Sequence, residues 1–206
     1  MSITPVLPVD SPGALEECVR CINHNGVIVI PTDTVYGIGC SAFQSQPIER
    51  IFMVKGRDSN KAIPILIGGF EQINQVARSL NNKAETLMHL FWPGPLTIIV
   101  PRNPSLPVNL SPYDTIGIRM PNHTWLLSVL LKSGPLAVTS ANPSGKPEAK
   151  NVDEVIQCLD GKIDLIVNGG QSASAKPSTV VDCTGAEIRI LREGPILSAD
   201  ILKALS

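Results

Sequence analysis

Gly26-Val27-Ile28-Val29-Ile30-Pro31 is a short apolar run that is closed at both ends by residues that interrupt regular structure. Its length and its β-branched side chains indicate a strand buried on both faces. Before it, Leu15, Val19 and Ile22 recur at helical spacing. Ser11-Pro12 precedes them and is typical of an N-cap followed by the first helical residue. The sequence therefore predicts a helix of about three turns that leads into a buried strand.

The same alternation continues along the chain. Pro47 opens a second helical pattern, and Ala62 to Ile67 is predicted as a strand. The later elements are predicted, in order, as helix 83–91, strands 96–100 and 115–119, helix 124–131, strand 136–139, a helix capped by Asn151 that ends near Leu159, and strands 165–167, 179–182 and 187–191. Interleaved helices and buried strands indicate a layered α/β domain, and the closely spaced strands after residue 165 indicate a mixed sheet. We find no repeat and no linker, and expect one domain over residues 1–206.

The charge balance narrows the class of protein. The chain has 206 residues and a formal net charge of −1, from 17 Lys and Arg and 18 Asp and Glu. This excludes a disordered polyelectrolyte and a protein that is basic overall and coats nucleic acid. Charged residues make up 17%, against about 25% in typical domains, while 18 Pro and 16 Gly fix or free many backbone positions. The composition favours a compact protein with shaped loops.

The five cysteines are odd in number and irregularly spaced, which indicates a reducing compartment rather than a disulfide scaffold. The segment 1–5 lacks the basic and apolar regions of a signal peptide. The longest apolar stretches, 125–131 and 63–67, are far shorter than the roughly 18 residues of a membrane span. We therefore expect a soluble, cytoplasmic protein with no membrane partner.

Two nucleotide-binding patterns are present in the wrong context. Gly37 to Ala42 matches the dinucleotide motif G-x-G-x-x-A, but its first glycine comes seven residues after Ile30 and the next helix signal is Pro47. The motif requires an immediate strand–turn–helix connection. Ser144-Gly145-Lys146 resembles the end of a P-loop, but Ser140 stands where the leading glycine is needed. Neither pattern is interpreted as a phosphate loop.

Metal-ligand patterns are also incomplete. Cys18 and Cys21 form a lone C-x-x-C inside a predicted helix, with no second pair. Unpaired cysteines of this kind usually act as small buried hydrophobic residues. His24, His89 and His123 lack both the spacing and the acidic neighbours of a metal or catalytic site. We predict no metal ligands from the protein.

Four polar segments remain: 31–37 after the first strand, 55–61 at the end of the second helix, 139–147 after a later strand, and a group formed by Arg119, Ser178-Thr179 and Arg192. Ligands of α/β proteins usually bind beyond the carboxyl ends of strands. A hydrogen-bonded turn is the alternative interpretation of the first segment.

The second and third segments each pair two side chains. If the helix ends at Gly56, Lys55 and Arg57 can point to one side, which is unfavourable unless an anion lies between them. The alternative is a solvated helix end that complements the helix dipole. Pro143 favours an extended Asn142, so Ser140 and Asn142 are expected to project together and orient a phosphate or its metal. A plain Asn-Pro turn is the alternative there.

Six motifs occur in the order found in one family. They are Pro31-Thr32-Asp33-Thr34-Val35-Tyr36-Gly37, Lys55-Gly56-Arg57, Trp92-Pro93-Gly94-Pro95-Leu96-Thr97, Ile118-Arg119-Met120-Pro121, Thr139-Ser140-Ala141-Asn142-Pro143-Ser144-Gly145 and Pro177-Ser178-Thr179-Val180-Val181-Asp182. In these motifs, from about Gly26 to Pro195, the chain resembles the YrdC/TsaC family of threonylcarbamoyl-AMP synthases. Each motif alone is weak, but six in order are specific.

The resemblance implies a YrdC-like α/β fold of the short, single-domain type, with a twisted mixed sheet and flanking helices around a deep basic cavity. It also implies a reaction in which L-threonine, bicarbonate and ATP, with Mg²⁺, give threonylcarbamoyl-AMP and pyrophosphate. The product would pass to a separate tRNA threonylcarbamoyl transferase complex that modifies an adenosine of tRNA.

The resemblance also implies residue roles. The positions that match threonine-binding residues are Thr34, Arg119 and Ser178, with Arg119 pairing to the amino-acid carboxylate. The positions that match the catalytic set around the triphosphate and the reacting carboxylate are Lys55, Arg57, Ser140 and Asn142. Further nucleotide-contacting positions are Lys61, Thr115, Thr139 and Arg192. We expect electrostatic catalysis, in which the cations stabilise charge on the α-phosphate and on the departing pyrophosphate.

Three positions depart from the family pattern. Asp58 and Ala62 stand where prolines are common, which predicts a more mobile loop. Leu66 stands where some members have a histidine near threonine; one lost hydrogen bond to a charged group reduces affinity about 10- to 100-fold. The alternative functions are a YrdC-like module that binds RNA weakly and a paralogue without synthase activity.

Overall fold

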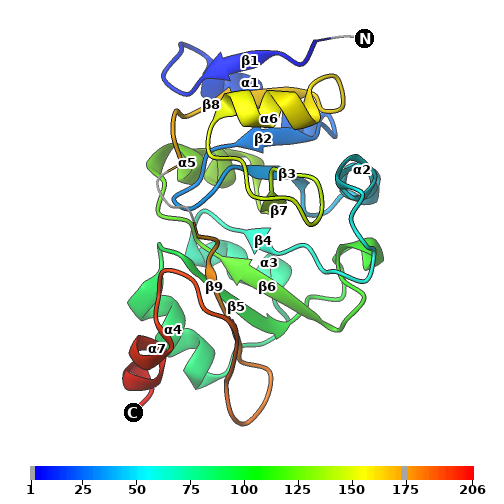
Figure 1. Cartoon of the computed structure of the whole chain (residues 1–206). Coiled ribbons are helices and arrows are strands. Elements are labelled where there is room, and N and C mark those ends of the chain that lie inside the picture. Colours follow the sequence, from blue (N-terminus) through cyan, green and yellow to red (C-terminus); the bar gives the residue numbers. More distant parts are fainter. Residues whose placement is uncertain (1–2, 173–175) are drawn as a thin grey trace.

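The computed structural model describes residues 3–172 and 176–206, and its described strands form one mixed sheet of ten strands. The order across the sheet is β1-β8-β2-β3-β7-β4-β6-β5-β9-β10 (Figure 1). The strands are β1 (Val6–Pro8), β2 (Ile28–Ile30), β3 (Gly37–Ser41), β4 (Ile65–Leu66), β5 (Leu96–Pro101), β6 (Thr115–Arg119), β7 (Leu136–Ser140), β8 (Leu165–Asn168), β9 (Thr179–Asp182) and β10 (Arg189–Arg192). Both parallel and antiparallel pairs occur, as in β2 with β8 and β2 with β3. The predicted mixed α/β sheet is confirmed.

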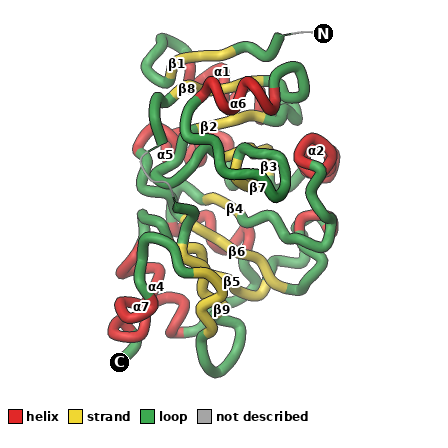
Figure 2. Tube along the Cα trace, viewed as in Figure 1, coloured by secondary structure: helices red, strands yellow, loops and turns green. Residues whose placement is uncertain are grey.

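Helices cover both faces of this sheet. They are α1 (Ala14–Asn23), α2 (Ser45–Lys55), α3 (Ile73–Val76), α4 (Asn82–Phe91), α5 (Thr124–Ser133), α6 (Val152–Leu159) and α7 (Ser198–Ala204), with short 3₁₀ turns η1 (Phe70–Gln72) and η2 (Val108–Leu110). Figure 2 shows long loops between these elements, such as those from α2 to β4 and from β7 to α6. The polar motifs lie in these loops and at the ends of the strands next to them.

Strand β2 shows why the apolar run at 27–30 forms a central strand. Ile28 and Ile30 pack with α1 and α5 in one core, whereas Val27 and Val29 belong to the core on the opposite face, with α2 and α6. All four side chains are fully buried. Because alternate residues of a strand face opposite sides, a continuous apolar run fits a strand covered on both faces.

Several predicted boundaries differ from the structure. The first helix begins at Ala14, after Gly13 at φ +80°, and Ser11 does not cap it. The Ser11 hydroxyl instead donates to the Pro8 carbonyl at 2.7 Å, so Ser11 and Pro12 form a turn before the helix. The predicted strand 62–67 is shortened to β4, residues 65–66. The end of α2 at Gly56, with φ +57°, and the Asn151 cap of α6 are confirmed.

The glycine-rich segment 37–41 is a strand, β3, which the sequence analysis had not predicted. It pairs antiparallel with β2 and with β7. A Cβ at Gly37 would lie 2.6 Å from Val138 Cγ1, and one at Gly39 would lie 2.7 Å from Val138 Cγ2. The glycines therefore make room for a side chain of β7, which gives them a packing role unrelated to a phosphate loop.

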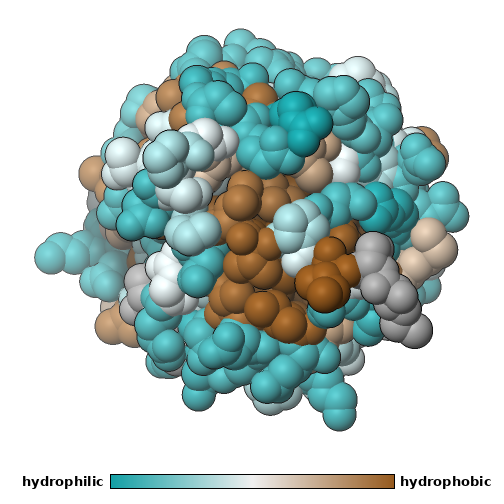
Figure 3. Space-filling model, turned by 90° about the horizontal axis from the view of Figure 1, so that it is seen from above, coloured by the Kyte–Doolittle hydropathy of each residue, from teal (hydrophilic) through white to brown (hydrophobic). Residues whose placement is uncertain are grey.

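The sheet edge formed by β1 carries exposed apolar residues, among them Ile3 and Val6. Seen from this end, a hydrophobic patch is bordered by hydrophilic side chains (Figure 3). No helix of the described residues is long and apolar enough to cross a membrane.

Candidate functional site

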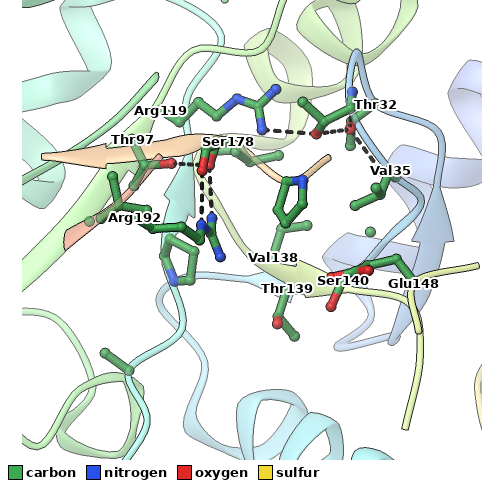
Figure 4. Close-up of a pocket in the computed structure, with 18 of the residues that line it drawn as sticks. Thr32, Val35, Thr97, Arg119, Val138, Thr139, Ser140, Glu148, Ser178 and Arg192 are labelled. Atoms are coloured by element: carbon green, nitrogen blue, oxygen red, sulfur yellow. Dashed lines mark hydrogen bonds between the residues drawn. The ribbon is translucent and has the colours of Figure 1, made fainter. Parts of the chain in front are cut away.

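A cavity of about 340 Å³ opens over the middle strands of the sheet (Figure 4). Its lining comes from the loop between β2 and β3, from β3 to β7, from the loop after α2, and from β9, β10 and the segments next to them. The polar and charged residues of the lining are Thr32, Thr34, Tyr36, Arg57, Thr97, Arg119, Thr139, Ser140, Glu148, Ser178 and Arg192. Most of the sequence motifs thus meet at one place, although they are up to 160 residues apart (residues 32 and 192).

Arg119, at the end of β6, is held in a fixed direction. Its Nε donates to the Gly94 carbonyl at 3.0 Å, and one terminal nitrogen forms an ion pair with Asp33. The other terminal nitrogen, Nη1, donates to the Thr34 hydroxyl at 3.1 Å. The Thr34 hydroxyl also lies 3.0 Å from that of Thr32. These contacts present a buried guanidinium and two hydroxyls to the cavity, a set suited to a small carboxylate ligand.

Ser178 lies directly before β9, which pairs in parallel with β5. Its hydroxyl is 2.8 Å from that of Thr97 on β5. Arg192, in β10, donates from Nε to the Ser178 carbonyl at 2.9 Å and from Nη2 to the Ser178 hydroxyl at 3.2 Å. Burial lowers the pKa of Arg192; repulsion by Arg119 adds to this effect and attraction to Glu148 opposes it. Three strands therefore fix a hydroxyl and a cation at one wall of the cavity.

Lys55 ends α2 and is 3% exposed. Its ammonium donates to the main-chain oxygens of Ser140 and of Asn142. Burial lowers the pKa of Lys55 to about 8, with a further contribution from Arg57, whereas Glu148 acts in the opposite direction. Lys55 does not line the cavity itself; it supports the strand end that carries Ser140.

Arg57 follows the left-handed Gly56 and lines the cavity. Its Nη2 donates to the Ala62 carbonyl at 2.9 Å, and its Nε donates to the Lys61 carbonyl at 3.3 Å. Burial lowers the pKa of Arg57. The guanidinium thus joins the start of the loop 57–62 to its end.

Ser140 and Asn142 are expected from the sequence to project to a common side, but in the structure they do not. Ser140 lines the cavity, whereas the Asn142 amide turns back to donate to the Pro143 carbonyl at 3.2 Å and to the Lys146 carbonyl at 2.5 Å. Its Oδ1 is buried and has no partner among the described residues. The physical reason is the tight Asn-Pro turn, in which the amide satisfies the main chain of its own loop.

The other predicted positions also fall into two groups, those that line the cavity and those that do not. Thr139 lines the cavity beside Ser140, and so does Leu66. Lys61 is exposed and Thr115 is half-buried at the start of β6, and neither contributes to the lining. The cations that the resemblance assigns to the site are Lys55, Arg57, Lys61, Arg119 and Arg192, and of these Arg57, Arg119 and Arg192 line the cavity.

Three residues of the site had no predicted role. Asp33 orients Arg119, Thr97 bonds Ser178, and Glu148 brings a carboxylate into the cavity. Asp33 and Thr97 lie inside two of the six sequence motifs, 31–37 and 92–97, so their position is a usable signal. Glu148 lies just outside one and had no signal of its own.

Comparison with known proteins places the chain in a family. The Sua5/YciO/YrdC family model, described as "Telomere recombination", matches residues 20–194. A threonylcarbamoyl-AMP synthase of Pyrococcus abyssi is 37% identical over 186 residues, which are 89% of this chain and 55% of that protein. A putative threonylcarbamoyl-AMP synthase of Mycobacterium leprae is 36% identical over 192 residues, 93% of this chain and 87% of that one. The chain belongs to the Sua5/YrdC family.

A solved structure agrees with this assignment. P. abyssi Sua5 complexed with L-threonine superimposes with a TM-score of 0.93 at 33% identity, over 99% of this chain and 61% of that one. The chain thus spans little more than half of the P. abyssi protein.

Proposed function

We propose that this protein is a threonylcarbamoyl-AMP synthase. The observation that carries the proposal is the Arg119 guanidinium, fixed by Gly94 and Asp33 and aimed with Thr34 into a cavity that also contains Ser178 and two further arginines. This combination suits an amino-acid carboxylate next to a polyphosphate. The names of the relatives and the threonine bound by P. abyssi Sua5 support the same assignment.

In the proposed reaction, the threonine amine adds to bicarbonate, and water is lost to give a carbamate. An oxygen of the carbamate then attacks the α-phosphorus of ATP, and the bond to pyrophosphate breaks, so that pyrophosphate leaves with the electron pair. Arg119, Thr34 and Ser178 hold threonine in line, while Arg57 and Arg192 stabilise the charge on the phosphates. Lys55 acts through the Ser140 strand end, and Thr139 is a proposed nucleotide contact inside the cavity. Asn142, Lys61 and Thr115 do not line it, so we propose their contacts only for parts of ATP that extend past the lining.

Mg²⁺ enters this proposal with ATP. Among the described residues, no group of three or more His, Cys, Asp or Glu side chains could hold a metal ion. Mg²⁺ typically keeps several waters and takes one or two carboxylates together with substrate phosphates. The cavity fits that pattern, since Glu148 is its carboxylate. The ion would neutralise phosphate charge.

The product, threonylcarbamoyl-AMP, would be consumed by a separate tRNA threonylcarbamoyl transferase complex. The cytoplasm is the proposed location, and the free thiols of all five cysteines support a reducing compartment.

Threonine-dependent release of pyrophosphate from ATP in bicarbonate buffer tests the proposal. We expect release by the wild-type protein and strong losses in Lys55→Ala and Asn142→Ala. Lys203→Ala, on the exposed face of α7, serves as the control and should retain activity. A folded wild-type protein that releases no pyrophosphate in response to threonine would falsify the assignment.

A further inference from the structure

Glu148 is a carboxylate in a cavity whose other charged side chains are arginines. It lies in the loop between β7 and α6, is half-buried and lines the cavity. In Figure 4 it is drawn next to Ser140, away from Ser178 and Arg192. No hydrogen bond or ion pair reaches its carboxylate from residues 3–172 or 176–206. Among the described residues, its carboxylate therefore interacts with the nearby cations only at longer range, without a direct contact.

The surroundings of Glu148 include the groups proposed to meet the triphosphate. Lys55 donates to the Ser140 carbonyl. The negative charge of Glu148 attracts the cations of Lys55 and Arg192. An ATP molecule without metal carries several negative charges into the same cavity, and like charges at short range repel. A triphosphate that brings a divalent cation with it replaces this repulsion by attraction, because hard cations prefer carboxylate and phosphate oxygens.

We propose that Glu148 makes nucleotide binding dependent on a divalent cation, its carboxylate facing the cation that accompanies the triphosphate. This inference rests on the proposed function, since it assumes that the cavity takes ATP. Ser140, beside Glu148 in the lining, adds a hydroxyl that can bond a water of the cation's shell. Glu148 thus selects the metal-bound form of the nucleotide.

A carboxylate can also accept hydrogen bonds from ribose hydroxyls. That role predicts discrimination between ATP and its deoxy analogues and no special dependence on metal. The two roles therefore separate in a binding experiment.

The experiment measures binding of a non-hydrolysable ATP analogue by calorimetry, in Mg²⁺ and in EDTA. We expect Mg²⁺ to strengthen binding by the wild-type protein about tenfold or more, within the usual range of coupling between two ligands. In Glu148→Gln the metal-free affinity should rise and the Mg²⁺ affinity should fall, so that the ratio approaches one. Glu148→Asp should keep most of the dependence, and Glu85→Gln on α4, which makes the same change in net charge outside the cavity, should keep all of it.

A second readout uses Mn²⁺ in place of Mg²⁺. The paramagnetic resonance signal of free Mn²⁺ reports how tightly the protein–nucleotide complex holds the ion, and the affinity should be lower in Glu148→Gln. Circular dichroism and thermal unfolding verify that the variant is folded.

An unchanged ratio in a folded Glu148→Gln variant would overturn the inference, as would loss of discrimination against 2′- or 3′-deoxy analogues with the metal dependence intact. In both cases the wild-type protein binds nucleotide and the proposed function stands. Wild-type protein that binds no nucleotide in either buffer would overturn both.

Discussion

The ammonium of Lys55 donates to the main-chain oxygen of Asn142 at 2.5 Å and also to that of Ser140. A motif lysine at the end of α2 is thereby tied to the last residue of β7 and to the loop that follows it, 85 and 87 residues away. The buried ammonium shapes the backbone of the Ser140 segment, and a ligand next to that segment would sense its charge. Two predictions follow from its environment.

The first concerns proton uptake. The pKa of Lys55 is about 8 in the ligand-free protein because burial disfavours the charged form. A bound triphosphate favours that form and raises the pKa, so nucleotide binding at pH 8 should take up about half a proton. Calorimetry of an ATP analogue in buffers of different ionisation enthalpy measures this uptake. It should be absent in Lys55→Met and retained in Lys203→Met; equal uptake by all three proteins would contradict it.

The second concerns stability. The pKa of Lys55 is about 8 when folded, against 10.5 for an exposed lysine, so the unfolded state binds more protons between these values. Stability should therefore rise with pH from about 8 to about 10.5, and below pH 8 the buried charge costs on the order of 3 kcal/mol. Urea unfolding at pH 7 and pH 10 measures the change. Relative to Lys55→Met, the wild-type protein should gain stability at pH 10; a constant difference would exclude this account.

Arg119→Lys should weaken threonine binding about 10- to 100-fold. Lysine keeps the charge but lacks the planar fork that reaches Gly94, Asp33 and Thr34 at once. Calorimetric titration with L-threonine measures the loss, and binding of an ATP analogue should change little. Arg78→Lys, at an exposed position, is the matched control. Wild-type affinity in Arg119→Lys would show that the fork is not needed.

Tyr36→Phe should destabilise the fold by about 1–3 kcal/mol. The buried Tyr36 hydroxyl donates to the Gly170 carbonyl at 2.7 Å and accepts from the Gly169 N–H at 3.0 Å, so its removal leaves main-chain groups without a partner. Urea unfolding should show a clear loss, whereas Tyr113→Phe, at a 59% exposed position, should show almost none. Similar losses in both variants would argue against the role of the Tyr36 hydroxyl.

The sequence predicted elements whose cause is local. The β-branched run at 27–30, the stop at Gly56 and the Asn151 cap depend on nearby residues, and each is found in the structure. Strands β1 and β3 were missed for the opposite reason. β1 is short and ends in proline, and it is held by pairing with β8, where Val6 lies opposite Ile166. β3 is rich in glycine, and only its contact with Val138 explains why.

In the site, too, residues within local motifs could be predicted, and contacts between distant segments could not. Motif order was enough to select Arg57, Arg119, Ser140 and Ser178, and the fourth polar group added Arg192; all five line the cavity. Motif order could not indicate that Lys55 donates to main-chain oxygens, or that the Asn142 amide donates to a carbonyl of its own loop. Both contacts depend on the path of the chain at the end of β7 and after it. Glu148 was missed because a single acidic residue in a loop carries no pattern.

The order of strands across the sheet also bears on how the protein forms during synthesis. Most neighbours in the sheet are distant in the sequence, as with β1 and β8 or β5 and β9. Topologies dominated by such distant pairings fold slowly, on a scale of milliseconds to seconds, because long loops must close first. Ser178 and Arg192 emerge from the ribosome long after Lys55 and Arg119. A growing chain therefore cannot complete the cavity until residue 192 has left the ribosome, so the wall that contains Ser178 and Arg192 is the last to be added.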